Sequence, residues 1–326
     1  MAQMENMTLF SGRANQPLAE SIARHLGIHL GNIEIFEFSN ENIFVKIDES
    51  VRENDVFILQ SLTTPVSTSI VELLIIIDAM KRASAGRITA VLPYYAYGRT
   101  DKKDQPRVPI TARLVADLIT VAGANRVLTV DLHAGQIQGF FNIPVDELTA
   151  MYLLADYFRH KRLPERVVVS TDIGNAKRAR NFAELLDAPL AIVEKRRNGN
   201  ADRTEVLNLI GDVEGKCALL VDDEIDTAGS ITQAANVVMQ NGAKEVYACC
   251  THAILSGRAM ERLAASGIQE LVVTDTVPIP ARKHLKNLTI LSVAPMLAET
   301  IRRVHTGASV GAVFEADRQG MLDESS

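Results

Sequence analysis

The sequence lacks several features that would point to other classes of protein. Its 34 lysines and arginines do not exceed its 40 aspartates and glutamates, so a net charge of −6 gives no general preference for nucleic acid. No apolar run approaches the roughly 18 to 20 residues that a membrane-spanning helix needs. The N-terminus has no basic segment followed by an apolar one, so we expect no secretory signal.

Cysteine is also scarce. The three cysteines, Cys217, Cys249 and Cys250, lie in apolar, strand-like runs and lack the spacing of a metal site. Such cysteines are typical of core residues in a reducing compartment. With 326 residues, of which 47% are hydrophobic, the chain is long enough for about two domains. We therefore expect a soluble cytoplasmic protein without a nucleic-acid or membrane partner.

The common nucleotide-binding motifs are missing as well. The chain has no G-x-x-x-x-G-K-[ST] loop and no G-x-G-x-x-G after a strand. It also lacks a plausible Ser–His or Cys–His arrangement for covalent catalysis. A nucleotide, if one binds, must therefore be held in another way.

What the chain does contain is a recurring pattern of an amphipathic helix, a glycine stop and a β-rich strand. The pattern occurs at residues 73–92, 111–130 and 231–250. Strands that alternate with helices of this length predict mainly parallel sheets flanked by helices. Because both halves carry the pattern, we expect an α/β fold of two similar domains, 1–150 and 151–326.

The most informative segment is 221–230, VDDEIDTAGS, which follows an apolar run and precedes a helical pattern. A small-residue turn that enters a helix offers backbone N–H groups and the positive end of the helix dipole to an anion. The acids Asp222, Asp223 and Asp226 suit hydroxyls, or the metal ions that accompany a phosphate. Together these features favour a sugar phosphate, and the alternative is a solvated acidic turn with a helix N-cap.

Ligands of doubly wound sheets lie beyond the carboxyl ends of the strands, so the residues after each predicted strand matter. His133 follows one such strand and Asp172 follows another. Asp172 suits a hard cation, whereas His is an unusual ligand for Mg²⁺. The alternatives are a structural histidine and an N-cap for the helix after Asp172.

Two charged segments also follow strands. Residues 195–203, KRRNGNADR, predict a mobile basic loop that could close over a polyphosphate and neutralise charge during transfer. In 94–104, YYAYGRTDKKD, Arg99 could reach phosphates and an aromatic ring could stack on a base. The alternatives are a solvated surface loop, and core tyrosines followed by a solvated turn.

Taken together, these segments resemble the ribose-phosphate pyrophosphokinase family over about residues 8–315. The most specific block is 129–141, TVDLHAGQIQGFF, with 221–230 close behind. Residues 82–91, RASAGRITAV, and 172–174, DIG, are also typical. The resemblance implies two phosphoribosyltransferase-like domains in a homo-oligomer, usually a hexamer. It implies an enzyme that transfers a diphosphoryl group from MgATP to the C1 hydroxyl of ribose 5-phosphate, giving phosphoribosyl pyrophosphate and AMP with Mg²⁺ as cofactor.

The resemblance also implies roles for individual residues. The catalytic cations would be Lys195 and Arg197. Ribose 5-phosphate would be bound by Asp222, Asp223, Asp226, Thr227, Ala228, Gly229, Ser230 and Arg197. ATP would be contacted by Arg99, Thr100 and His133, and across a subunit boundary by Phe38, Asn40 and Asn42. The metal would be bound at His133 and Asp172, and a regulatory phosphate or ADP at Ser50, Arg107 and Ser309.

Some positions depart from the family pattern. Thr100 stands where Gln is usual, and Asn40 and Asn42 replace acids. Around the metal site, Thr171 replaces Pro and Asn175-Ala176 replaces Gly-Val. Near the regulatory site, Gly311 replaces a frequent Ser. The positions that keep the family's residues are Lys195, Arg197, His133, Asp172 and Asp222.

Two other functions compete with the synthetase. A base phosphoribosyltransferase would share the acidic sugar-phosphate loop, but such enzymes usually need only one domain. A silent regulatory subunit would have lost catalytic-loop or metal residues, and this chain keeps them.

Overall fold

A computed structural model describes residues 6–197 and 205–313, with only the backbone of 195–197 and 205–207. The chain forms two compact units. The first contains residues up to 149, 276–278, and those from 292 on; the second contains 150–275 and 279–291. Both are α/β, as the helix–strand alternation predicted. Of the helices in the described ranges, none combines the length and the apolar character needed to cross a bilayer.

The first unit is built on a five-stranded parallel sheet in the order β1-β4-β5-β6-β7. Its strands are β1 (Met7–Ser11), β4 (Asp55–Leu59), β5 (Arg87–Leu92), β6 (Arg126–Val130) and β7 (Val145–Leu148). A separate antiparallel hairpin consists of β2 (Ile33–Glu37) and β3 (Ile43–Ile47). The helices are α1 (Gln16–Leu26), α2 (Val66–Arg82), α3 (Thr111–Ala122) and α8 (Ala294–Thr306).

The strands of this sheet are apolar on both sides because helices pack on both faces. Alternate residues such as Val56, Ile58 and Ala90 belong to one core cluster with α2 and α3. The intervening Phe57 and Leu59 are also fully buried.

Glycine stops were predicted after three helices of the chain. Gly123 and Gly242 adopt φ +126° and +87° as expected, whereas Gly86 does not. There Ser84 takes the left-handed conformation, and a Cβ on Gly86 would lie 2.7 Å from the Glu53 carbonyl oxygen.

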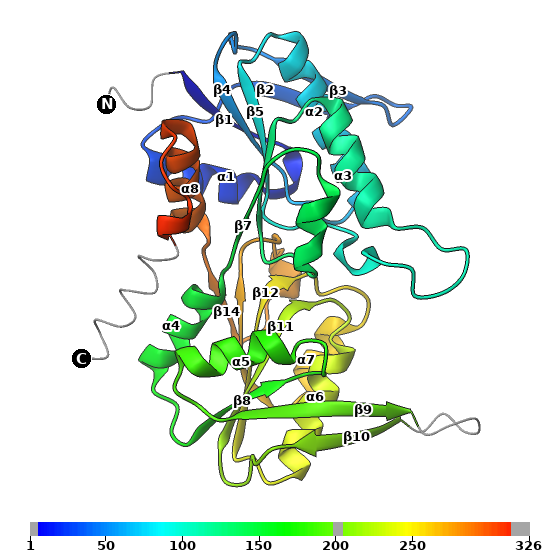
Figure 1. Cartoon of the computed structure of the whole chain (residues 1–326), viewed down its shortest axis with the longest axis vertical. Helices are drawn as coiled ribbons and strands as arrows, with labels where there is room; N and C mark the ends of the chain where they lie inside the picture. Colours follow the sequence, from blue (N-terminus) through cyan, green and yellow to red (C-terminus); the bar gives the residue numbers. More distant parts are fainter. Residues whose placement is uncertain (1–5, 198–204, 314–326) are drawn as a thin grey trace. The chain divides into compact units, whose positions relative to one another are not determined.

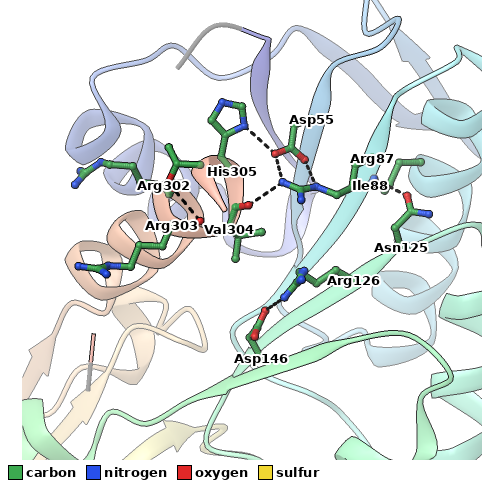
Figure 2. Close-up of polar contacts among 11 residues, drawn as sticks. Asp55, Arg87, Ile88, Asn125, Arg126, Asp146, Arg302, Arg303, Val304 and His305 are labelled. Atoms are coloured by element: carbon green, nitrogen blue, oxygen red, sulfur yellow. Dashed lines mark hydrogen bonds and ion pairs between the residues drawn. The ribbon is translucent and has the colours of Figure 1, made fainter. Parts of the chain in front are cut away.

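Helix α8 belongs to the first unit although it comes last in the chain. It packs against α1 (Figure 1). Figure 2 shows the polar anchor: His305 Nδ1 lies 2.8 Å from the Asp55 carboxylate, and Arg87 donates both to Asp55 and to the Val304 carbonyl. The compact units thus differ from the predicted division at 150, because residues 276–278 and the segment with the C-terminal helix α8 belong to the first unit. The boundaries of the two domains stay a prediction.

The second unit is built on a seven-stranded sheet in the order β10-β9-β8-β11-β12-β13-β14, parallel except for β10. Its strands are β8 (Arg166–Ser170), β9 (Leu190–Arg197), β10 (Glu205–Ile210), β11 (Cys217–Ile225), β12 (Glu245–Ala253), β13 (Ile268–Thr274) and β14 (Leu288–Leu291). Its helices are α4 (Met151–Lys161), α5 (Ala176–Leu185), α6 (Gly229–Gln240) and α7 (Ala259–Ala265). The three cysteines are buried in β11 and β12, in the core positions predicted for them.

Candidate active site

The acidic segment lies within the central strand of the second unit. We expected the strand to end near Val221, but β11 continues to Ile225 and pairs with β12 as far as Ala253. Asp222 and Asp223 are therefore strand residues rather than loop residues. The longer ladder holds their backbone rigidly, so the carboxylates are directed by the pleat of the sheet.

Asp222 is held at both of its carboxylate oxygens. Thr171 Oγ1 donates to Oδ2 at 2.7 Å, and the backbone N–H of Asp223 donates to Oδ1 at 2.9 Å. Burial, and then the adjacent Asp223, raise the pKa of Asp222 to about 8. Two crowded acids of this kind attract a cation or hydroxyl donors, because either relieves the unfavourable burial of charge.

The turn after β11 has the geometry of an anion site. Ala228 adopts φ +60° and helix α6 begins at the next residue, so the first N–H groups of the helix have no helical acceptor. Asp226 is fixed by Ser256, whose hydroxyl and backbone N–H both donate to it, the latter at 2.9 Å.

Cations that the sequence analysis missed lie beside this turn. Arg262 in α7 donates to the Thr227 carbonyl at 2.8 Å. Burial, and then Arg282, lower the pKa of Lys283, whereas Asp226 acts in the opposite direction. No local pattern signals these residues, since only the packing of α7 against α6 brings Arg262 to the turn. The turn is therefore more cationic than its own sequence indicates.

Asp172 lies at the same edge of this sheet, because β8 and β11 are parallel neighbours with Ser170 opposite Val221. Its Oδ1 accepts the backbone N–H of Asn175 at 2.8 Å. Asp172 therefore closes the turn before α5 but is not the N-cap of that helix, which is Asn175 and carries no side-chain cap. Carboxylates of this kind suit Mg²⁺, but within the described residues no group of three or more His, Cys, Asp and Glu could by itself hold a metal ion.

In the first unit, His133 is exposed after β6, and the turn that carries Arg99 and Thr100 packs against it. A Cβ on Gly98 would lie 3.1 Å from the Cβ of His133, so glycine permits this approach. The Thr100 hydroxyl donates to the Tyr97 carbonyl at 2.7 Å. The structure thus brings together three of the residues predicted to contact ATP.

The other residues of the first unit that were predicted to contact ATP lie at the tip of the β2–β3 hairpin. The Phe38 N–H donates to the Asn42 carbonyl at 2.9 Å, and Asn40 Oδ1 accepts the Asn42 N–H at 3.2 Å. Phe38 is 49% exposed, with its ring centroid 5.1 Å from that of Phe36. The hairpin therefore presents an aromatic ring and two amides to its surroundings.

The three residues of the predicted regulatory site are exposed in the first unit: Ser50, Arg107 and Ser309. Arg303 Nη1 donates to the Ser309 carbonyl at 3.0 Å, which holds the end of α8. Arg107 adopts φ +67°.

The predicted catalytic cations lie at the end of β9. Lys195 and Arg197 are strand residues, opposite Leu207 and Glu205 of β10, so the expected basic loop begins later than residue 195. Their side chains and residues 198–204 lie outside what the structure describes.

A cavity of about 570 Å³ lies elsewhere in the second unit. Its lining includes Arg159, Arg162, Arg166 and Lys216, around the N-terminal ends of β8 and β11. The predicted site is at the opposite, carboxyl ends of these strands, where ligands of such sheets bind. The cavity is therefore not a candidate for the active site.

Comparison with known proteins identifies the family. The model of the N-terminal domain of ribose phosphate pyrophosphokinase matches residues 7–123, and the phosphoribosyl synthetase-associated domain matches 198–315. The ribose-phosphate pyrophosphokinase of Caldanaerobacter subterraneus subsp. tengcongensis is 55% identical over 316 residues, 96% of this chain and 100% of the relative. That of Oceanobacillus iheyensis is 52% identical over 310 residues, 95% and 98% of the two chains.

A solved structure agrees with these relatives. The crystal structure of phosphoribosylpyrophosphate synthetase from Mycobacterium smegmatis superposes with a TM-score of 0.89 at 46% identity, covering 93% of this chain and 100% of that one. Similarity in sequence and in fold extends over nearly the whole length of both chains. The chain belongs to the ribose-phosphate pyrophosphokinase family.

Proposed function

We propose that the protein transfers a diphosphoryl group from MgATP to the C1 hydroxyl of ribose 5-phosphate, forming phosphoribosyl pyrophosphate and AMP. The observation that carries the proposal is the end of β11: two crowded acids, followed by a turn that enters the N-terminus of α6, in a chain that spans the full length of synthetase relatives. Acids for sugar hydroxyls and N–H groups for a phosphate match the two ends of ribose 5-phosphate.

In this proposal the 5-phosphate binds the turn formed by Ala228, Gly229 and Ser230. The α6 dipole and the adjacent Arg262 favour its charge. Asp222 and Asp223 accept the ribose hydroxyls, and Asp226 and Thr227 complete the binding loop.

Lys195 and Arg197 would neutralise the charge that develops on the transferring group, which is the main source of rate in phosphoryl transfer. Asp172 and His133 would hold Mg²⁺, which supplies further positive charge there. Arg99 and Thr100 would contact ATP with His133, and Phe38, Asn40 and Asn42 would reach the ATP of a neighbouring subunit. Hexameric assembly, a cytoplasmic location and regulation at Ser50, Arg107 and Ser309 are parts of the same proposal.

One assay tests the reaction. AMP formation from ATP is measured with and without ribose 5-phosphate, across a titration of inorganic phosphate. Formation of AMP that depends on ribose 5-phosphate supports the synthetase. A base phosphoribosyltransferase would instead release pyrophosphate from phosphoribosyl pyrophosphate with a base, and a silent subunit would do neither. Light scattering on the protein as it elutes from a size-exclusion column measures its oligomeric state.

A further inference from the structure

Two side chains on the segment after β8 bind the end of β11. Besides the Thr171 bond to Asp222, Asn175 Nδ2 donates to the Val221 carbonyl at 2.7 Å. Thr171 is 6% exposed, so water has little access to compete for its hydroxyl. Because Ser170 and Val221 are opposite each other in the parallel ladder, the next residues along both strands come side by side. The register therefore places the hydroxyl beside the carboxylate.

This hydrogen bond has a consequence for the orientation of the acid. The Asp223 N–H holds one oxygen of Asp222 and Thr171 holds the other, so the carboxylate is confined to one orientation. A binding group confined in this way does not lose further freedom when the ligand arrives. The bond also favours the ionised carboxylate, in opposition to the burial that raises the pKa of Asp222.

We propose that Thr171 is a positioning residue that orients Asp222 toward the hydroxyls of ribose 5-phosphate. The inference rests on the proposed function and deepens it. The side chain that orients Asp222 comes from the segment that directly follows β8.

The hydrogen bond from Asn175 allows an orienting role of Thr171 to be distinguished from a role in holding the segment against β11. Asn175 fastens the segment to the Val221 carbonyl independently of Thr171. Removal of the Thr171 hydroxyl therefore leaves the segment bound to β11 and releases only the carboxylate. If Thr171 only held the segment against β11, its replacement would change the stability of the fold but not the affinity for ribose 5-phosphate.

The test compares Thr171→Val, which keeps the shape and removes the hydroxyl, with Thr171→Ser, which restores it. We expect Thr171→Val to raise KM for ribose 5-phosphate about tenfold, equivalent to about 1.4 kcal/mol, with kcat and KM for ATP within about threefold of wild type. We expect Thr171→Ser to return KM to within about twofold of wild type. The matched control is Thr274→Val, which removes a buried hydroxyl that donates to the Thr251 carbonyl at 2.7 Å. Thr274→Val should lower the melting temperature and leave KM for ribose 5-phosphate unchanged.

An unchanged KM in Thr171→Val, or a serine variant as impaired as the valine variant, would overturn the inference. If thermal unfolding shows that Thr171→Val does not fold, Thr171→Ala gives the same comparison with serine. Failure of the proposed function gives a different result, because the wild-type protein would then form no AMP in response to ribose 5-phosphate. That result would contradict both the proposed function and the role of Thr171.

Discussion

His305 Nδ1 lies 2.8 Å from the carboxylate of Asp55, although 250 residues separate them in the chain. Arg87 donates to the same carboxylate and to the carbonyl of Val304 at 2.9 Å (Figure 2). Asp55 is therefore the point at which strands β4 and β5 hold the C-terminal helix. The predicted regulatory residue Ser309 lies shortly after that helix, beyond its C-cap Gly307.

Replacement of Asp55 by Asn should destabilise the first unit by about 2 kcal/mol, because Arg87 and His305 lose a shared, largely buried partner. Urea unfolding measures the change. The matched control is Asp78→Asn, which breaks an exposed pair with Arg82 and should change stability by less than about 0.5 kcal/mol. Equal effects of the two variants would argue against the anchor.

Replacement of Lys195 by Ala should lower kcat by about 10²- to 10³-fold while the fold survives, because its cation acts mainly in the transition state. Steady-state assays with a thermal unfolding control measure the effect. Near-normal turnover would remove Lys195 from the catalytic assignment.

Replacement of Asp222 by Asn should raise KM for ribose 5-phosphate about tenfold or more, because a charged acceptor for the ribose hydroxyls is lost. The measurement is a ribose 5-phosphate titration at saturating ATP. Unchanged sugar affinity would contradict the role of the acid in binding the ribose hydroxyls.

Asp222 should also make the stability of the ligand-free enzyme depend on pH. Its pKa rises from about 3.9 in the unfolded chain to about 8 in the fold. The folded state thus binds the proton more tightly, and this contribution is complete below about pH 4 and is lost as pH rises through about 8.

Relative to Asp222→Asn, wild-type stability should therefore fall by a few kcal/mol between pH 4 and 8. Urea unfolding of both proteins across this range measures it. The control is Asp212→Asn, since Lys216 lowers the pKa of exposed Asp212 and its contribution changes only in more acidic solution. A constant difference between wild type and Asp222→Asn would refute the shift.

Replacement of Arg107 by Ala should weaken activation by phosphate and inhibition by ADP together, if one site serves both ligands. Titrations of each ligand at fixed substrate concentrations measure the two effects. Loss of only one effect would show that the sites are separate.

Local sequence patterns were sufficient for the alternation of helices and strands. The periodicity of 111–130 and 231–250 corresponds to α3–β6 and α6–β12 within a few residues. The same patterns located Asp172 and the acids of β11 at one sheet edge, because parallel neighbours end together. They did not show that β11 continues to Ile225 or that β9 continues to Arg197 as part of a hairpin, since pairing with a neighbouring strand decides where a strand ends.

The sequence by itself determined the α/β class and the family, and it predicted the residues of the candidate site, because these depend on short segments whose residues are adjacent in the chain. The tertiary structure alone decided the long-range contacts. These include the return of α8 to Asp55, the placement of Arg262 at the Thr227 carbonyl, and the hydrogen bond from Thr171 to Asp222. Each joins segments whose spacing carries no periodic signal, so only the packing of the folded chain brings them together.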